Sequence, residues 1–216
     1  MFLPLKTETE SRFAAVESFF RATRILPKNE ERAARGLAFV HMYAAYEHTI
    51  RTGMQLAIDT IASKNHQTKE LSPPLLSLFL DSKLRSLKDC GTKDIWKKRL
   101  QLFEEVFSNS TPTIDNQIIP TDGTHYRYSH LQTIFAVLGI NRMPARRTIH
   151  LHRINEIVGN RNAIAHGRET ADEVGRRYSR SDVQHRIKQI KSVSSFFITA
   201  IESHCGNPIN YKRSSS

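Results

Sequence analysis

Apolar residues recur every three or four positions along most of the chain, which is the period of an amphipathic helix. The longest such pattern predicts one helix over residues 29–64, with its apolar stripe at Leu37, Val40, Ala44, Met54, Ile58 and Ile61. A shorter helix is predicted before it, beginning at the capping-box pattern Thr7-x-x-Glu10 and ending at Pro27. No alternating strand pattern and no hairpin turn occurs in the sequence. The pattern therefore predicts an all-α fold, an up-and-down helical bundle with extra helices.

Prolines and glycines mark where the later helices begin and end. Ser72-Pro73 begins one helix and Gly91 ends it. The apolar positions of the next helix are Ile95, Trp96, Leu100, Phe103 and Phe107. Three more helices are predicted: a short one from the capping pattern Ser129-x-x-Gln132 through Leu138, one over residues 148–166 and one from Ser181 onward. Gly167 suits the left-handed position that follows a helix end.

Residues 108–127 interrupt the helical pattern. They contain Pro112, Pro120 and Asp122-Gly123, which predict a long loop. A loop of this length inside a compact domain is often functional. We expect a single domain over residues 1–209, followed by a flexible tail at residues 210–216.

The chain is strongly basic. Its 216 residues include 32 Lys and Arg against 21 Asp and Glu, which gives a formal net charge of +11. Most of the excess lies in residues 142–191, which hold twelve basic and five acidic residues, and ten of the twelve are Arg. The planar guanidinium group suits phosphate, and a basic face is typical of a nucleic-acid-binding protein. A solvated surface that favours solubility accounts for the charge equally well.

Several classes of protein are not expected because the sequence lacks their features. Cys90 and Cys205 form no C-x-x-C pair, so neither a zinc ribbon nor a disulfide scaffold is predicted. No glycine-rich loop for ATP or a dinucleotide occurs, and no apolar run reaches the ~20 residues that cross a membrane. We expect a cytoplasmic protein with no cofactor and no membrane contact.

Two histidine pairs are the nearest approach to a metal site, His150-x-His152 and His125-x-x-x-x-His130. Alternate residues of a helix do not face each other, and no carboxylate is spaced to complete a ligand set. We expect these histidines to have surface or core roles, and we expect no metal site.

One segment carries residues suited to metal-free RNA cleavage. It runs from Glu156 to Gly167 and contains Arg161, Asn162 and His166. Such cleavage needs a base for the 2′-hydroxyl proton, an acid for the leaving oxygen and a cation beside the phosphate. Histidine can serve as base or acid near neutral pH, and arginine supplies a fixed charge. Five Arg–His pairs in the chain have a comparable separation, but only this one lies directly before a helix-ending glycine.

The segment Arg161-Asn162-Ala163-Ile164-Ala165-His166-Gly167 resembles the signature of the HEPN superfamily, in which an Arg is followed by four to six residues and then a His. Ile157-Val158-Gly159 before it and the helix from Ser181 after it strengthen the resemblance. Tyr43-Ala-Ala-Tyr46-Glu47, within the long upstream helix, does so as well. The RiboL-PSP-associated and MAE-type HEPN groups are the most similar.

The resemblance is closest over residues 151–201 and looser over residues 33–61. It implies a HEPN-type helical bundle that forms a homodimer. It also implies a metal-independent endoribonuclease that leaves 2′,3′-cyclic phosphate ends, in a toxin–antitoxin or phage-defence setting. In such an enzyme Arg161 and His166 would be catalytic, and Asn162 would be their polar support.

Residues five apart on a helix point about 140° apart, at 100° per residue. Arg161 and His166 of one chain are therefore expected to converge poorly on one phosphate, and two copies meeting across a two-fold axis would complete a composite site. Arg146, Arg147 and Arg168 flank the motif in the basic stretch and are candidate RNA contacts.

The sequence leaves alternatives open. The domain could instead be a non-catalytic module that binds RNA, a nucleotide or a protein within a multi-subunit complex, with an antitoxin or sensor protein as partner. Arg161 could form an ion pair within the bundle, and His166 could cap its own helix. Glu47 could orient Arg161 or be an ordinary surface acid, whereas Tyr43 and Tyr46 are expected in the core.

One departure from the family pattern bears on control of the activity. In HEPN toxins silenced by a nucleotidyltransferase, a Tyr lies two residues after the His, whereas this chain has Arg168 there. Tyrosine adenylylation at the motif is therefore not expected, and any antitoxin would have to act differently.

Overall fold

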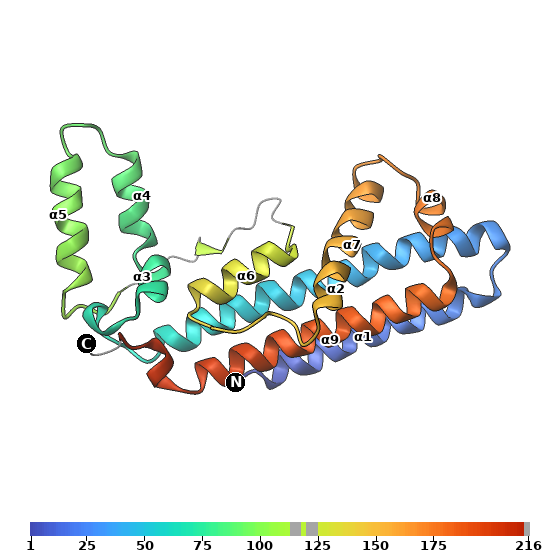
Figure 1. The fold of residues 1–216 in the computed structure, drawn as a ribbon, viewed down its shortest axis with the longest axis horizontal. Coiled ribbons are helices and arrows are strands. Elements are labelled where there is room, and N and C mark those ends of the chain that lie inside the picture. The colour runs from blue at the N-terminus through green and yellow to red at the C-terminus, as the bar shows by residue number, and fades with distance from the viewer. Residues whose placement is uncertain (113–117, 120–124, 214–216) are drawn as a thin grey trace. The chain divides into compact units, whose positions relative to one another are not determined.

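The computed structural model describes residues 1–112, 118–119 and 125–213. Helices dominate this part of the chain, and its only strand-like pairing is an isolated antiparallel bridge between Leu71 and Lys212. The all-α prediction is therefore confirmed. In chain order the α-helices are α1 (Leu3–Ala22), α2 (Lys28–Ala62), α3 (Pro73–Phe79), α4 (Asp81–Asp89), α5 (Ile95–Val106), α6 (Tyr128–Val137), α7 (Thr148–Ala165), α8 (Ala171–Arg176) and α9 (Arg180–Cys205) (Figure 1). None of these helices is long and apolar enough to cross a membrane.

Contacts within the chain divide it into two compact units. The first contains residues 1–53, 125–132 and 143–200, and the second contains residues 54–124, 133–142 and 201–216. The boundaries fall inside α2, α6 and α9, so each unit is built from segments that are far apart in the sequence. The loop predicted over residues 108–127 lies in part outside the described residues.

The first unit buries an apolar core between α1, α9 and the N-terminal part of α2 (Figure 1). Thr9 Oγ1 on α1 lies 3.1 Å from Thr49 Oγ1 on α2, and Lys191 Nζ on α9 lies 2.7 Å from a carboxylate oxygen of Glu10. Its fully buried large side chains include Phe13, Phe20, Phe39, Met42, Tyr43, Tyr46, Ile50 and Phe197. Aromatic rings from three helices thus fill the centre of this unit.

α8 approaches α2 more closely than side chains would allow. A Cβ atom built on Gly36 of α2 would lie 2.0 Å from the carbonyl oxygen of Ala171. One built on Gly175 of α8 would lie 1.9 Å from the carbonyl oxygen of Arg32. Any side chain at either position would overlap the backbone of the other helix, so only glycine permits this packing.

The C-terminal segment belongs to the core of the second unit. The Tyr211 ring is fully buried, and its hydroxyl donates a hydrogen bond to the carbonyl oxygen of Cys205. The backbone N–H of Arg213 donates to the carbonyl oxygen of Glu70 at 2.7 Å. The tail predicted to be flexible from residue 210 is thus held as far as Arg213, because Tyr211 brings a large ring to bury.

The first helix begins earlier than predicted. Thr7 lies inside α1, which begins at Leu3. Pro4 suits the first turn of a helix, and both Phe2 and Leu5 are buried, so the helical backbone extends back to them.

The apolar face of α2 also differs from the predicted stripe. Leu37 is 45% exposed and Ala44 is exposed, whereas Ala38, Phe39 and Met42 are buried. α1, α8 and α9 all contact α2, so α2 is buried on more than one side. Its buried residues therefore include neighbours in the sequence and do not form one stripe with a spacing of three or four residues.

α3, α4 and α5 lie in the second unit. Ser72 is the N-cap residue of α3 and Pro73 opens its first turn, as predicted. α4 and α5 pack side by side as a helical hairpin, and neither contributes a buried residue (Figure 1).

Candidate functional site

α7 carries Arg161 in its last turns and ends directly before His166, which is its C-cap residue. Gly167 follows with a positive φ of 67°, the left-handed conformation predicted for it. The N–H of Arg168 donates to the carbonyl oxygen of Ala163 at 2.9 Å, which closes a Schellman motif. The chain therefore reverses just after His166 and leaves this side chain exposed.

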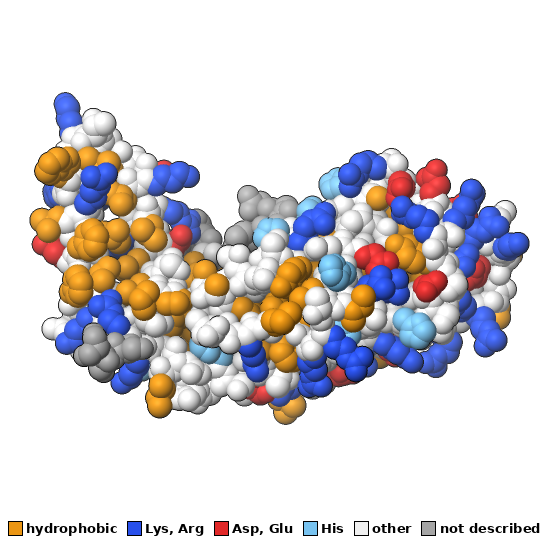
Figure 2. Space-filling view, viewed as in Figure 1, with side chains coloured by type: hydrophobic (Ala, Val, Ile, Leu, Met, Phe, Trp, Pro, Cys, Tyr) orange, Lys and Arg blue, Asp and Glu red, His pale blue; other side chains and the backbone are white. Residues whose placement is uncertain are grey.

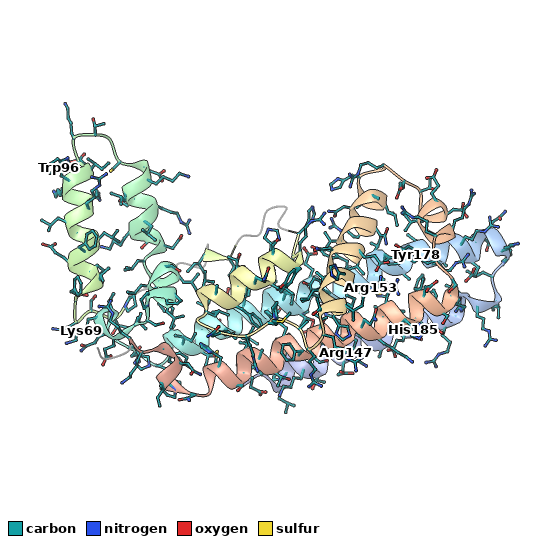
Figure 3. The ribbon with its side chains drawn as sticks, in the orientation of Figure 1. Lys69, Trp96, Arg147, Arg153, Tyr178 and His185 are labelled. Carbon is teal, nitrogen blue, oxygen red and sulfur yellow. The ribbon has the colours of Figure 1, made fainter. Side chains whose placement is uncertain are left out.

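An ion-pair cluster holds α7 against α9. Glu156 accepts hydrogen bonds from Arg153 Nη1 at 2.8 Å and from Arg186 Nε at 3.0 Å; Arg153 is labelled on α7 in Figure 3. Burial alone would raise the pKa of Glu156, but the hydrogen bonds from Arg186 and Arg153 outweigh it and lower the pKa. Glu156 is thus paired with these two arginines and not with Arg161.

A second contact holds α7 just before the motif. The hydroxyl of Tyr178 accepts a hydrogen bond from Asn160 Nδ2 at 2.9 Å. The Tyr178 ring, labelled in Figure 3, lies 4.7 Å from the ring of Phe39 on α2, measured between centroids. This contact ties the turn of α7 that precedes Arg161 to the core of the first unit.

Arg161 is oriented by two neighbours. Its guanidinium group lies over the ring of Tyr43, with Cζ 4.9 Å from the ring centroid, and its Nη1 donates a hydrogen bond to Oδ1 of the buried Asn162 at 2.9 Å. Within the described part of the chain no carboxylate pairs with Arg161. The charge is therefore held in place without being neutralised, and most of its N–H donors remain available.

Tyr43 and Tyr46 are buried in the core, as predicted. Burial and the nearby Glu47 carboxylate raise the pKa of Tyr43, so its hydroxyl stays protonated and donates to Glu47 Oε1 at 3.1 Å. Glu47 forms no ion pair with Arg161 among the residues that the structure describes. Its contact with Arg161 is indirect, through the tyrosine on which the guanidinium group lies.

His125 joins this group from the segment that precedes α6. Its ring centroid lies 6.4 Å from that of His166. The Tyr46 hydroxyl donates to the carbonyl oxygen of Tyr126 at 2.8 Å, and this buried hydrogen bond holds the neighbouring His125 beside α2. Two histidines of one chain therefore lie side by side in the first unit.

The surroundings of His125 favour its neutral form. Partial desolvation lowers the pKa of His125 below its ordinary value of 6.5, and the positive charge of Arg161 lowers it further. Glu47 opposes this shift, while His166 and Arg127 add to it. His125 is accordingly neutral at pH 7, with a ring nitrogen able to accept a proton.

The sequence pairs His125 with His130 only as the nearest approach to a metal site, with surface or core roles expected for both, and it does not predict that His125 lies beside His166. In the structure His130 Nδ1 accepts a hydrogen bond from the backbone N–H of Arg127 at 3.3 Å, at the start of α6. Among the described residues no group of three or more potential metal ligands occurs. The sequence feature that could have pointed to His125 is its position near the end of the loop predicted over residues 108–127.

The candidate RNA contacts are all exposed. Arg168 lies just after the chain reversal, close in sequence to His166. Arg146 and Arg147 lie at the opposite end of α7, where Figure 3 labels Arg147. At a rise of 1.5 Å per residue they are roughly 20 Å along the helix from Arg161. The structure does not bring these two arginines together with the motif.

Comparison with known proteins identifies the family. The family model described as RiboL-PSP-HEPN matches residues 7–203, which include the motif, His125 and the upstream tyrosines. No curated protein and no solved structure matches the chain. Since the family model covers almost the whole sequence, the chain belongs to the RiboL-PSP-HEPN family, a member of the HEPN superfamily.

Proposed function

We propose that this protein is an endoribonuclease that cleaves RNA without a metal ion in the reaction. The 2′-hydroxyl oxygen attacks the adjacent phosphorus, and the bond from phosphorus to the 5′-oxygen of the next nucleotide breaks. The products carry a 2′,3′-cyclic phosphate and a 5′-hydroxyl. The observation that carries the proposal is the pair His125 and His166, with ring centroids 6.4 Å apart, beside the un-neutralised charge of Arg161. Membership of a superfamily that includes many ribonucleases supports it.

In this proposal His125 is the base and His166 is the acid. His125 takes the proton from the 2′-hydroxyl, because its lowered pKa keeps the ring unprotonated at pH 7. His166, exposed at the end of α7, gives a proton to the departing 5′-oxygen. Each transfer needs heavy atoms about 2.6–3.2 Å apart. Two rings with centroids 6.4 Å apart can meet this need on the two sides of one phosphate.

Arg161 stabilises the negative charge that grows on the phosphate oxygens in the transition state. Asn162 and Tyr43 are positioning residues, since one accepts a hydrogen bond from the guanidinium group and the other places an aromatic face beneath it. Neither needs to touch the RNA.

The exposed arginines are proposed RNA contacts. Arg168 suits a phosphate next to the cleaved one. Arg146 and Arg147 would meet the strand roughly 20 Å away, which is about six nucleotides at 3.4 Å each. We propose a toxin–antitoxin or phage-defence setting on family membership alone, with an antitoxin or sensor protein as the controlling partner.

The test is incubation of the purified protein with total tRNA and a mixed RNA pool in EDTA. His125→Ala and His166→Ala are compared with wild type and with His152→Ala, a control at an exposed position of α7. We expect wild type and the control to leave 2′,3′-cyclic phosphate ends. Each site variant should lose cleavage by about a hundredfold or more, the usual contribution of general acid–base catalysis.

Other outcomes separate the alternatives. Products with 3′-hydroxyl ends, or an absolute need for Mg²⁺, would contradict the mechanism. Loss of cleavage in His166→Ala but not in His125→Ala would remove His125 from the reaction. Binding of RNA by the folded wild type without cleavage would favour the non-catalytic binding module.

A homodimer with a composite site remains the alternative to this one-chain site. Coexpression of Arg161→Ala with His166→Ala distinguishes the two. If Arg161 of one copy works with His166 of the other, each mixed dimer holds one intact site and regains part of the activity. If one chain supplies both residues, no activity returns.

A further inference from the structure

α5 presents an apolar stripe to solvent, formed by Trp96, Leu100, Phe103 and Phe107. These side chains are 81%, 61%, 62% and 64% exposed. Figure 2 shows hydrophobic side chains gathered over this helix, and Figure 3 shows Trp96 at its outer edge. A contiguous patch of this kind on a folded protein marks an interaction surface.

The stripe has the spacing of a helix–helix interface. Its members follow one another at intervals of four, three and four residues, the pattern of coiled-coil seams. Three other apolar residues of α5 lie on a different side of the helix and are less exposed: Ile95, Leu102 and Val106. The stripe is therefore additional to the side of α5 that packs on α4.

Two charged residues border the stripe on the same flank. Lys97 directly follows Trp96, and Glu104 directly follows Phe103, so the two lie seven residues apart on one side of the helix. Both are exposed, and neither forms an ion pair within the described chain. On this flank the stripe thus has a positive charge beside its first half and a negative charge beside its second half. Arg213 lies over the ring of Phe107, with Cζ 5.6 Å from the ring centroid.

This arrangement is complementary to itself when reversed. If two α5 helices run in opposite directions with Leu100 level with Phe103, then Trp96 is level with Phe107 in each copy. Lys97 of one copy then faces Glu104 of the other, and the two-fold axis repeats the pair. A parallel arrangement would instead place the basic end of each helix beside the same basic end.

We propose that the α5 stripe binds the α5 stripe of a second copy of this chain, antiparallel and two-fold symmetric. The proposal does not depend on the nuclease activity. Beside the first half of the stripe Lys97, Lys98 and Arg99 would attract phosphate, but beside the second half Glu104 and Glu105 would repel it. A reversed second copy suits both halves, because it brings Lys97 to Glu104.

The area is sufficient for a reversible dimer. Aromatic side chains bury about 150–250 Å² each, so at these exposed fractions the three from each copy would bury roughly 600–1,000 Å² in total. Leu100 and the flanking side chains bring the interface to about the 1,000 Å² that a specific contact needs. A contact of this size is expected to dissociate in the micromolar range.

Trp96 provides a direct probe because it is the only tryptophan in the chain. We expect its fluorescence to shift to shorter wavelength as the protein concentration rises, in step with dimer formation measured by sedimentation. Leu100→Glu should weaken this dimer by more than about a hundredfold, since it would bury a charge in the seam. Ile25→Glu, at a position 91% exposed in the first unit, is the matched control and should leave the dimer unchanged.

Charge exchange tests the antiparallel register. Lys97→Glu alone and Glu104→Lys alone each create two repulsive pairs and should each weaken the dimer by about tenfold or more. An equal mixture of the two variants should dimerise as wild type does, because every pair across the mixed interface is then opposite in charge. Circular dichroism of each variant checks that the helices are intact.

The proposal is overturned if wild type stays monomeric throughout the micromolar range. It is also overturned if wild type dimerises with Trp96 emission unchanged, since the dimer would then use another surface. A Trp96 response to single-stranded RNA, with none to protein concentration, would assign the stripe to RNA. Failure of the mixed variants to pair would reject the antiparallel register.

Discussion

The buried side chain of Asn162 helps to orient the charged guanidinium group of Arg161. It accepts a hydrogen bond from Arg161 at 2.9 Å, while Tyr43 supports the same guanidinium group from below. We expect Asn162→Ala to lower kcat for RNA cleavage by about tenfold with little change in KM, because a hydrogen bond to a charged group is worth about 1.5–3 kcal/mol. A variant that loses thermal stability but keeps kcat would show that Asn162 has only a structural role.

The environment of His125 sets the pH dependence of the proposed reaction. A base must be unprotonated, and the pKa of His125 is lowered below 6.5 by desolvation and then by Arg161. The kcat/KM profile should therefore stay high down to pH 6.5 and fall only at more acidic pH.

A neighbouring charge allows this assignment to be tested. Arg127 also lowers the pKa of His125, so Arg127→Gln should raise that pKa and move the acid limb of the profile to higher pH. The backbone N–H that Arg127 donates to His130 is unaffected by the substitution. An acid limb that does not move would assign the limb to a different group.

At the residue scale, the sequence could group candidate site residues only where they lie close together along the chain. Arg161, Asn162 and His166 lie within one helical turn and a half, so the sequence could propose them together, although their spacing is shared by other Arg–His pairs and the helix-ending Gly167 was needed to choose among them. His125 could not be found in this way, because its position depends on the hydrogen bond from Tyr46 to Tyr126, whose partners are 80 residues apart. Only the folded chain creates that neighbourhood.

At the element scale, the contact of α2 with α8 depends on two glycines. Gly36→Ala would place a methyl group 2.0 Å from the carbonyl oxygen of Ala171 and force the helices apart. We expect the free energy of unfolding to fall by about 1–3 kcal/mol or more, as for other overpacked sites. Urea denaturation measures this change.

Gly159 provides the matched control for that substitution. It lies inside α7, and a Cβ atom there would meet nothing within 4 Å. Gly159→Ala should therefore stabilise the protein by about 0.5–1 kcal/mol, because alanine loses less backbone entropy in a helix. Equal effects of the two substitutions would contradict the close packing of α2 and α8.

Helix ends were predictable where a local residue determines them. Gly167 and Ser72-Pro73 act through their own backbone geometry, and both predictions are confirmed. α8 was missed because it has only six residues, although Thr170 and Glu173 form the capping box that begins it. The buried face of α2 was not predictable from spacing, since several helices pack around it.

At the scale of the whole molecule, the C-terminal segment completes the second unit. Deletion of residues 208–216 removes the buried Tyr211 and the backbone hydrogen bond from Arg213 to Glu70. Loss of a buried aromatic side chain costs about 3–5 kcal/mol, so the urea midpoint should fall markedly. Deletion of residues 214–216 keeps these contacts and is the matched control. Similar midpoints for both deletions would show that the segment contributes nothing to stability.

The division into two units was not readable from the sequence. Composition shifts and linkers reveal domains that follow one another along the chain, whereas these units share α2, α6 and α9. The sequence shows that the α5 stripe is apolar, but only the structure shows how exposed it is and that Arg213 lies over the ring of Phe107.

The long-range contacts of α9 have a consequence during translation. Arg180 donates hydrogen bonds to the carbonyl oxygen of Phe20 and to Glu31, which precede it by 160 and 149 residues, and Arg186 pairs with Glu156 on α7. A nascent chain that has emerged only as far as His166 has the full motif but lacks the helix against which α7 packs. We therefore expect the proposed nuclease to become active on the ribosome only after α9 has been made.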